Sequence, residues 1–94
     1  MDLSRFSLEG RTAIVTGGTG GIGLGTAKAM ALAGANIAIA GVPPEQLPGA
    51  VAEVKALGVD AIGIKCDVSN KAEVADMVAQ TAKHFGRIDI LANV

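Results

Sequence analysis

The residues of this chain with the clearest potential for chemistry are the glycines between Thr16 and Gly23, in the sequence TGGTGGIG. An apolar run, 13–15, precedes them, and a helical pattern of small residues, 24–33, follows. A glycine turn between a strand and a helix can bind a dinucleotide pyrophosphate, because backbone N–H groups and the positive end of the helix dipole meet there. This context predicts a phosphate-binding turn.

The glycines of this turn are expected to have separate roles. Gly17 allows a tight turn out of the strand, Gly21 allows close approach of the phosphates, and Gly23 allows the helix to pack closely on the sheet. A plain glycine-rich loop is the alternative interpretation. The phosphate loop of nucleoside triphosphatases is excluded, because no Gly-Lys-Ser/Thr follows the glycines.

The rest of the chain alternates apolar runs, which predict strands, with helical patterns that end at glycines. The expected strands are 12–16, 36–40, 61–65 and 88–93. The expected helices are 24–33, 47–57 and a third that begins after Ser69 or Asn70 and ends before Gly86. The apolar face predicted for the third helix consists of Val74, Met77, Val78, Thr81, Ala82 and Phe85.

This order of elements, βαβαβαβ with short loops, predicts an α/β fold with a parallel sheet. We expect residues 1–94 to form part of a doubly wound Rossmann fold, with the four strands in the order 3-2-1-4. Ligands bind such sheets at the carboxyl ends of the strands, where the strand order reverses. Gly17 and Asn93 should therefore face each other across one crevice.

Composition excludes several classes of function. Half of the residues are hydrophobic and the net charge is −1, so nothing in the chain calls for nucleic acid or a membrane surface. No apolar run approaches the ~20 residues of a membrane span. The single cysteine, Cys66, cannot form an internal disulfide, which favours a reducing cytoplasm. Cys66 and His84 have no further ligands at metal spacing, so no metal site is expected.

Three blocks of the sequence resemble the amino-terminal part of the classical short-chain dehydrogenases/reductases. The block 6–17, FSLEGRTAIVTG, is similar to the family's first strand and glycine turn. Cys66-Asp67-Val68-Ser69 is similar to its Asp-Val step, and the block 86–93, GRIDILAN, to the run into its Asn-Asn-Ala-Gly motif. Because Gly20 and Gly21 are both present, the turn also fits the extended, epimerase-like branch of the family.

The resemblance implies a set of cofactor-binding residues. The turn would contact the phosphates, Asp67 would accept a hydrogen bond from the adenine amino group beside Val68, and Asn93 would lie near the ribose. Asp67 could instead be only a cap or turn residue, and Asn93 could also have a structural bond. The full set is Gly17, Thr19, Gly20, Gly21, Ile22, Gly23, Gly41, Val42, Asp67, Val68 and Asn93.

The end of the second strand bears on the choice between NAD and NADP. NAD-binding proteins of this fold usually carry an acid there, and NADP-binding proteins use an arginine for the 2′-phosphate. This chain has Gly41 and Val42 at those positions, and Gly20 where many NADP-dependent members have arginine. A 2′-phosphate without a cation is costly to desolvate, which favours NAD over NADP.

The family's chemistry is hydride transfer between nicotinamide and an alcohol or ketone, with a Tyr-x-x-x-Lys motif. This chain contains no tyrosine, so no catalytic residue is expected in it. It resembles the cofactor half of a longer oxidoreductase, whose substrate would be a small alcohol, ketone or sugar acid. A stand-alone nucleotide-binding module and a non-functional truncation are the alternatives. Because the next strands of the family's sheet are not among these 94 residues, the fourth strand is expected to be an exposed edge, which favours self-association.

Overall fold

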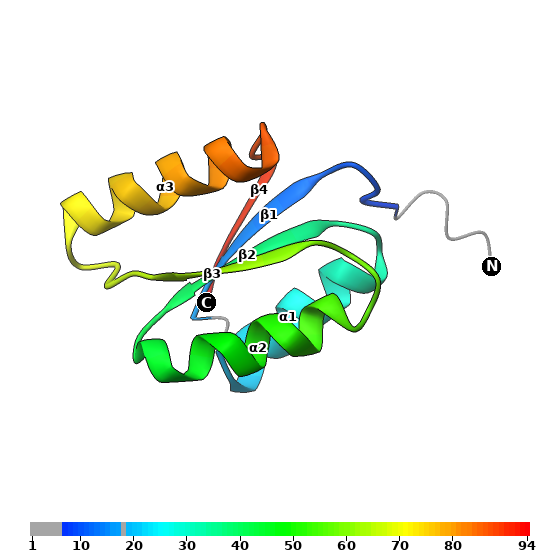
Figure 1. The fold of residues 1–94 in the computed structure, drawn as a ribbon, viewed down its shortest axis with the longest axis horizontal. Coiled ribbons are helices and arrows are strands. Elements are labelled where there is room, and N and C mark those ends of the chain that lie inside the picture. The colour runs from blue at the N-terminus through cyan, green and yellow to red at the C-terminus, as the bar shows by residue number, and fades with distance from the viewer. Residues whose placement is uncertain (1–6, 18) are drawn as a thin grey trace.

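The computed structural model describes residues 7–17 and 19–94, and its strands form one parallel sheet (Figure 1). The strands are β1 (Thr12–Thr16), β2 (Asn36–Gly41), β3 (Ala61–Lys65) and β4 (Ile90–Asn93). Their order in the sheet is β3-β2-β1-β4, and all neighbouring pairs are parallel. The predicted fold class and strand order are therefore confirmed.

Helices cover both faces of this sheet (Figure 1). They are α1 (Gly21–Leu32), η2 (the 3₁₀ turn Pro44–Gln46), α2 (Leu47–Lys55) and α3 (Lys71–Phe85). Helices α1 and α2 lie on one face, and α3 lies on the other. Helix α1 begins at Gly21, earlier than the predicted residue 24, so part of the glycine turn is the first turn of the helix.

Each face of the sheet has its own apolar core. On the side of α1 and α2, Val15 and Ile39 pack with Val54. On the side of α3, Ile14 and Ile64 pack with Met77. Every residue of β1 is buried, as expected for a central strand with helices on both faces. This rigid strand leads directly into the glycine turn.

The apolar face predicted for α3 is only partly buried. Met77 and Thr81 are buried, but Val78 is 44% exposed and Ala82 is exposed as well. Helix α3 contacts β2 and β3 and leaves β4 largely uncovered, so that Leu91 on β4 is 61% exposed. Leu91 is thus an exposed aliphatic side chain on the strand that the sequence predicts to be an edge of the sheet.

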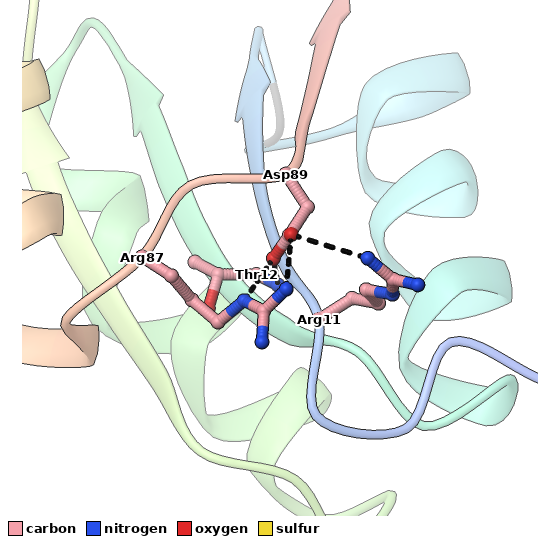
Figure 2. A network of polar contacts seen from close by, with 4 residues as sticks. All are labelled: Arg11, Thr12, Arg87 and Asp89. Carbon is pink, nitrogen blue, oxygen red and sulfur yellow. Dashed lines mark hydrogen bonds and ion pairs between the residues drawn. The ribbon is translucent and has the colours of Figure 1, made fainter.

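Strand β4 begins at Ile90, two residues later than predicted. Just before it, the Asp89 N–H donates to the Thr12 carbonyl oxygen at 2.9 Å, and the Thr12 N–H donates to the Asp89 side chain. The Asp89 carboxylate accepts the Thr12 N–H at 2.9 Å and two bonds from the Arg87 guanidinium, at 2.8 and 2.6 Å. Arg11 lies 3.5 Å away on the other side (Figure 2). The bonds from Arg87 and Thr12 lower the pKa of Asp89 to about 2. This network joins β1 and β4 at their amino ends.

Candidate functional site

The carboxyl ends of all four strands surround one small cavity of about 170 Å³. Its lining residues are Thr16, Gly17, Gly41, Val42, Cys66, Asp67, Val68 and Val94. Five of the predicted cofactor-binding residues are in this set: Gly17, Gly41, Val42, Asp67 and Val68. The volume is below the roughly 300–1,000 Å³ of typical ligand pockets, so the cavity suits one part of an extended ligand rather than the whole.

Gly17 makes the tight turn that the sequence predicts at the end of β1. Its φ is +70°, in the left-handed region, and its N–H donates to the Ala40 carbonyl oxygen at 2.8 Å. A Cβ atom at Gly17 would lie 3.3 Å from the carbonyl oxygen of Val94. The Thr19 methyl group lies 3.6 Å from where a Cβ of Gly41 would be. The glycine turn therefore packs closely against the end of β2, beside the cavity.

The first turn of α1 has no cap of its own within the described residues. Gly20 is the N-cap in an extended conformation, without a side-chain hydrogen bond, and the turn contains no acidic residue. A Cβ at Gly21, where φ is +58°, would meet only open space, and Ile22 is 80% exposed. Gly23 is buried, consistent with its predicted packing role. The N–H groups of this turn are therefore available to an anion.

Asp67 and Val68 follow β3 and form the opposite side of the cavity. The Asp67 carboxylate accepts two bonds from Ser69, one from its hydroxyl at 2.7 Å and one from its N–H at 3.0 Å. These bonds lower the pKa of Asp67, which keeps the group ionised as a hydrogen-bond acceptor. Val68 is 58% exposed and offers an apolar surface next to this charge.

Asn93 lies at the end of β4 and is bound to β1. Its Oδ1 accepts the Thr16 hydroxyl at 2.9 Å, across the paired ends of the two strands. Asn93 lines a second cavity of about 170 Å³, between β4 and α3, which shares Thr16 and Val68 with the first. Asn93 thus has a structural bond and also borders the neighbouring cavity, while Gly17 faces Val94 instead.

Two further reactive side chains, Cys66 and His84, are given no role in cofactor binding, although Cys66 lines the cavity. Cys66 is 1% exposed, and burial, more than the nearby carboxylates, raises the pKa of its thiol. His84 binds Asp60 at 2.8 Å beside a larger hollow of about 640 Å³, to which no predicted cofactor residue contributes. Among the described residues there is no group of metal-binding side chains, and no helix is long and apolar enough to cross a membrane.

Sequence reasoning missed several residues of the site. Thr16 and Val94 line the cavity because they directly flank predicted residues in the strand ends. Ser69 was expected as one of two possible helix caps, but Asn70 is the N-cap and Ser69 binds Asp67 instead. The Asp-x-Ser spacing could have indicated this, because Asp side chains commonly bind the backbone two residues on.

A parallel sheet with an uncapped glycine turn at its carboxyl edge defines the Rossmann-type class of dinucleotide-binding folds. Residues 11–94 match the family model described as short chain dehydrogenase. The chain belongs to this family, and the predicted resemblance to classical short-chain dehydrogenases/reductases is confirmed. Membership implies a nicotinamide dinucleotide cofactor.

Individual relatives agree with this assignment. The chain is 40% identical over 84 residues to the short-chain dehydrogenase/reductase SDRA of Arabidopsis thaliana, covering 89% of the chain and 33% of that protein. It is 37% identical over 94 residues to a 2-dehydro-3-deoxy-D-gluconate 5-dehydrogenase of Formosa agariphila, covering 99% of the chain and 36% of the relative. The chain thus spans about a third of the length of these curated relatives.

Solved structures of the family superpose closely on this fold. A hydroxysteroid dehydrogenase from Escherichia coli matches with a TM-score of 0.93 at 29% identity, over 98% of this chain and 39% of that one. An NAD+-bound xylitol dehydrogenase matches with a TM-score of 0.86 at 38% identity, over 89% of this chain and 32% of that one. The fold of the described residues is therefore that of the family.

Proposed function

We propose that this chain is the dinucleotide-binding part of an NAD(P)-dependent oxidoreductase, which transfers a hydride between nicotinamide and an alcohol or ketone. The observation that carries this proposal is the uncapped first turn of α1 beside a cavity lined by Asp67. Helix N-termini of this kind bind phosphates through backbone N–H groups and the helix dipole. Family membership supplies the rest of the argument.

The proposed cofactor would extend along the carboxyl edge of the sheet. Its pyrophosphate would bind at Gly20–Gly23 with Thr19 beside it, and its adenine would bind at Asp67 and Val68. The adenosine ribose would lie by Gly41 and Val42, and Asn93 would be near the nicotinamide side of the crevice. The open space above Gly21 supports this arrangement, because a side chain there would separate the phosphates from the backbone.

NAD is the favoured cofactor. The residues that line the cavity include Asp67 but neither lysine nor arginine, so nothing among them would neutralise a 2′-phosphate. An uncompensated phosphate loses its hydration without gaining an ionic partner. The NAD+-bound xylitol dehydrogenase, a structural relative, supports the same preference.

Turnover would require residues beyond these 94, because the sequence contains no tyrosine for the family's acid/base motif. We infer that the chain alone binds the dinucleotide without transferring hydride. The substrate of the longer protein would be a small alcohol, ketone or sugar acid. The Formosa agariphila relative, a sugar-acid dehydrogenase by name, supports the last of these.

A cytoplasmic location is proposed as well, because the buried, unpaired Cys66 thiol suits a reducing compartment.

Self-association is a second property that the β4 edge would confer on the 94-residue chain. β4 pairs only with β1 within the described residues, and Leu91 and Val94 are 61% and 55% exposed. An apolar strand with unpaired N–H and C=O groups is a template for pairing with another chain. Sedimentation velocity across a concentration series, run alongside the binding experiment, would measure this association.

The binding experiment is a calorimetric titration of the 94-residue chain with NADH and then NADPH. We expect saturable binding, tighter for NADH. Gly21→Val should weaken it by about 100-fold, because a β-branched residue is strained at positive φ and blocks charge-assisted N–H bonds. Gly25→Ala is the matched control: it lies in the same helix over open space and should leave affinity unchanged. A folded chain that binds neither dinucleotide would refute the proposal.

A further inference from the structure

The turn between β3 and α3 is organised by side chains that point back to Asp67. Ser69 donates both its hydroxyl and its N–H to the same carboxylate oxygen, Oδ1, at 2.7 and 3.0 Å. The N–H of Asp67 donates to Oε1 of Glu73, one turn into α3, at 3.3 Å. The described residues make no hydrogen bond to the other carboxylate oxygen, Oδ2. Asp67 is thus fixed at its backbone and at one oxygen, while the second oxygen stays available.

These contacts are not needed to cap α3. Asn70 is the N-cap, and its Oδ1 accepts the N–H groups of Ala72 and Glu73 at 3.0 and 3.2 Å. The side-chain cap of the helix therefore uses neither the Asp67 nor the Ser69 side chain. Their mutual bonds orient a charged group at the rim of a cavity that Asp67 and Val68 line. Asp67 is therefore not the cap of α3, although its bond to the Ser69 N–H is that of a turn residue.

We propose that Ser69 and Glu73 are positioning residues, which hold Asp67 so that its remaining carboxylate oxygen selects a base bearing an exocyclic amino group. The inference rests on the proposed dinucleotide function, in which adenine binds at Asp67 and Val68, and it adds the residues that hold the Asp67 carboxylate in place. Ser69 sets the direction of the carboxylate, and Glu73 sets the position of its backbone.

The selectivity follows from hydrogen-bond chemistry. An ionised carboxylate only accepts hydrogen bonds, so it pairs with the amino group of adenine and opposes the carbonyl oxygen at the same position of hypoxanthine. Holding the carboxylate in place before binding removes part of the ordering cost, which would otherwise reduce this discrimination. The bonds from Ser69 also lower the pKa of Asp67, which keeps it an acceptor.

The test compares NADH with reduced nicotinamide hypoxanthine dinucleotide, which differs at that one position of the base. We expect the wild-type chain to bind NADH at least tenfold more tightly. Ser69→Ala should lower this ratio at least threefold, and Ser69→Thr, which keeps the hydroxyl, should restore it. Glu73→Ala should also lower the ratio, and it provides a second variant should Ser69→Ala not fold.

Asn70→Ala is the matched control, because it weakens the α3 cap without removing a bond to the Asp67 carboxylate. A merely structural role of Ser69 would lower both affinities by one factor and leave the ratio unchanged, which would overturn the inference. Equal wild-type binding of the two dinucleotides would overturn it too, while still supporting the proposed function. A folded wild-type chain that binds neither would overturn both.

Discussion

Helices α1 and α3 begin at the same edge of the sheet, but their first turns are completed in different ways. At α3, the Asn70 side chain accepts two N–H groups, and the acidic Glu73 stands in the first turn. At α1, Gly20 offers no side chain, and the first turn has no acidic residue. Both helices leave N–H groups without intrahelical partners, as every α-helix does. Only α3 satisfies two of them with a side chain of its own, that of Asn70.

The proposed phosphate binding at α1 accounts for this difference, because a binding site exchanges some helix stability for free N–H groups. A side-chain cap is worth roughly 1 kcal/mol relative to alanine but only a few tenths relative to glycine, and an acidic residue in the first turn adds a few tenths through the helix dipole. Helix α1 forgoes both beside the cavity that Asp67 lines. Glycine at this point is poor for the isolated helix but leaves the N–H groups free for a phosphate. The same physics thus predicts a structural end at α3 and a binding end at α1.

A side-chain cap on α1 should make its first turn resemble that of α3, and it should have the largest effect on NADH affinity among the substitutions considered below. Gly20→Asp is sterically permitted, because φ is −170° and nothing lies within 4 Å of the added Cβ. The carboxylate would occupy the N–H groups and repel the pyrophosphate. We expect thermal stability to rise by a few tenths of a kcal/mol and affinity for NADH to fall on the order of tenfold. Calorimetry and thermal unfolding measure the two changes.

Gly20→Asn separates competition from repulsion, because it supplies a neutral cap of the same size. It should reduce NADH affinity less than Gly20→Asp does. Unchanged affinity in both variants would show that the first turn of α1 does not contact the phosphates.

Much of the fold was predictable because local signals agreed with one another. The buried run of β1 and the glycine that ends α3, with φ of +80° at Gly86, identify their elements without tertiary information. The start of β4 was not predictable, since it depends on Asp89 meeting Thr12, 77 residues away in sequence. Val78 has the spacing of a core residue, but its burial depends on a neighbour that the described residues do not supply.

The site was predictable where chemistry requires a specific residue type. Glycines at positive φ, such as Gly17 and Gly21, are strong signals because few other residues adopt that conformation. The partners of Asp67 were harder to predict, since Ser69 and Asn70 are equally good cap residues by type. Only the geometry shows that Asn70 caps α3 while Ser69 binds the carboxylate.

The reverse experiment removes the cap that α3 does have. Asn70→Ala deletes the acceptor for the N–H groups of Ala72 and Glu73. We expect the free energy of unfolding to fall by about 1 kcal/mol, measured by urea denaturation, with NADH affinity changed less than twofold. Asn70→Asp keeps the acceptor and should retain stability. A large loss of affinity in Asn70→Ala would mean that the start of α3 also belongs to the binding surface.

The smallest effect on the free energy of unfolding is expected at the amino edge of the sheet. There the Asp89 side chain accepts the Thr12 N–H, much as Asn70 accepts N–H groups at the start of α3. In Asp89→Asn the amide oxygen can still accept the Thr12 N–H, but the charge is lost, and an NH2 group replaces the oxygen Oδ1 that accepts from Arg87 and Arg11. The pKa of Asp89 is about 2 in the folded chain, against an ordinary value of 3.8. Because folding lowers the pKa, the carboxylate stabilises the fold fully above about pH 4 and loses this effect towards pH 2.

Stability curves between pH 2 and 7 would measure this contribution. The wild type should be more stable than Asp89→Asn at pH 7, by less than the effect of Asn70→Ala, and the two curves should converge as the pH falls from about 4 to about 2. Glu45→Gln, at an exposed position in η2, removes the same charge elsewhere and is the control, which should leave the stability at pH 7 unchanged. A constant gap between wild type and Asp89→Asn down to pH 2 would show that the amide disturbs packing, and that the ionised carboxylate contributes nothing to joining β1 and β4.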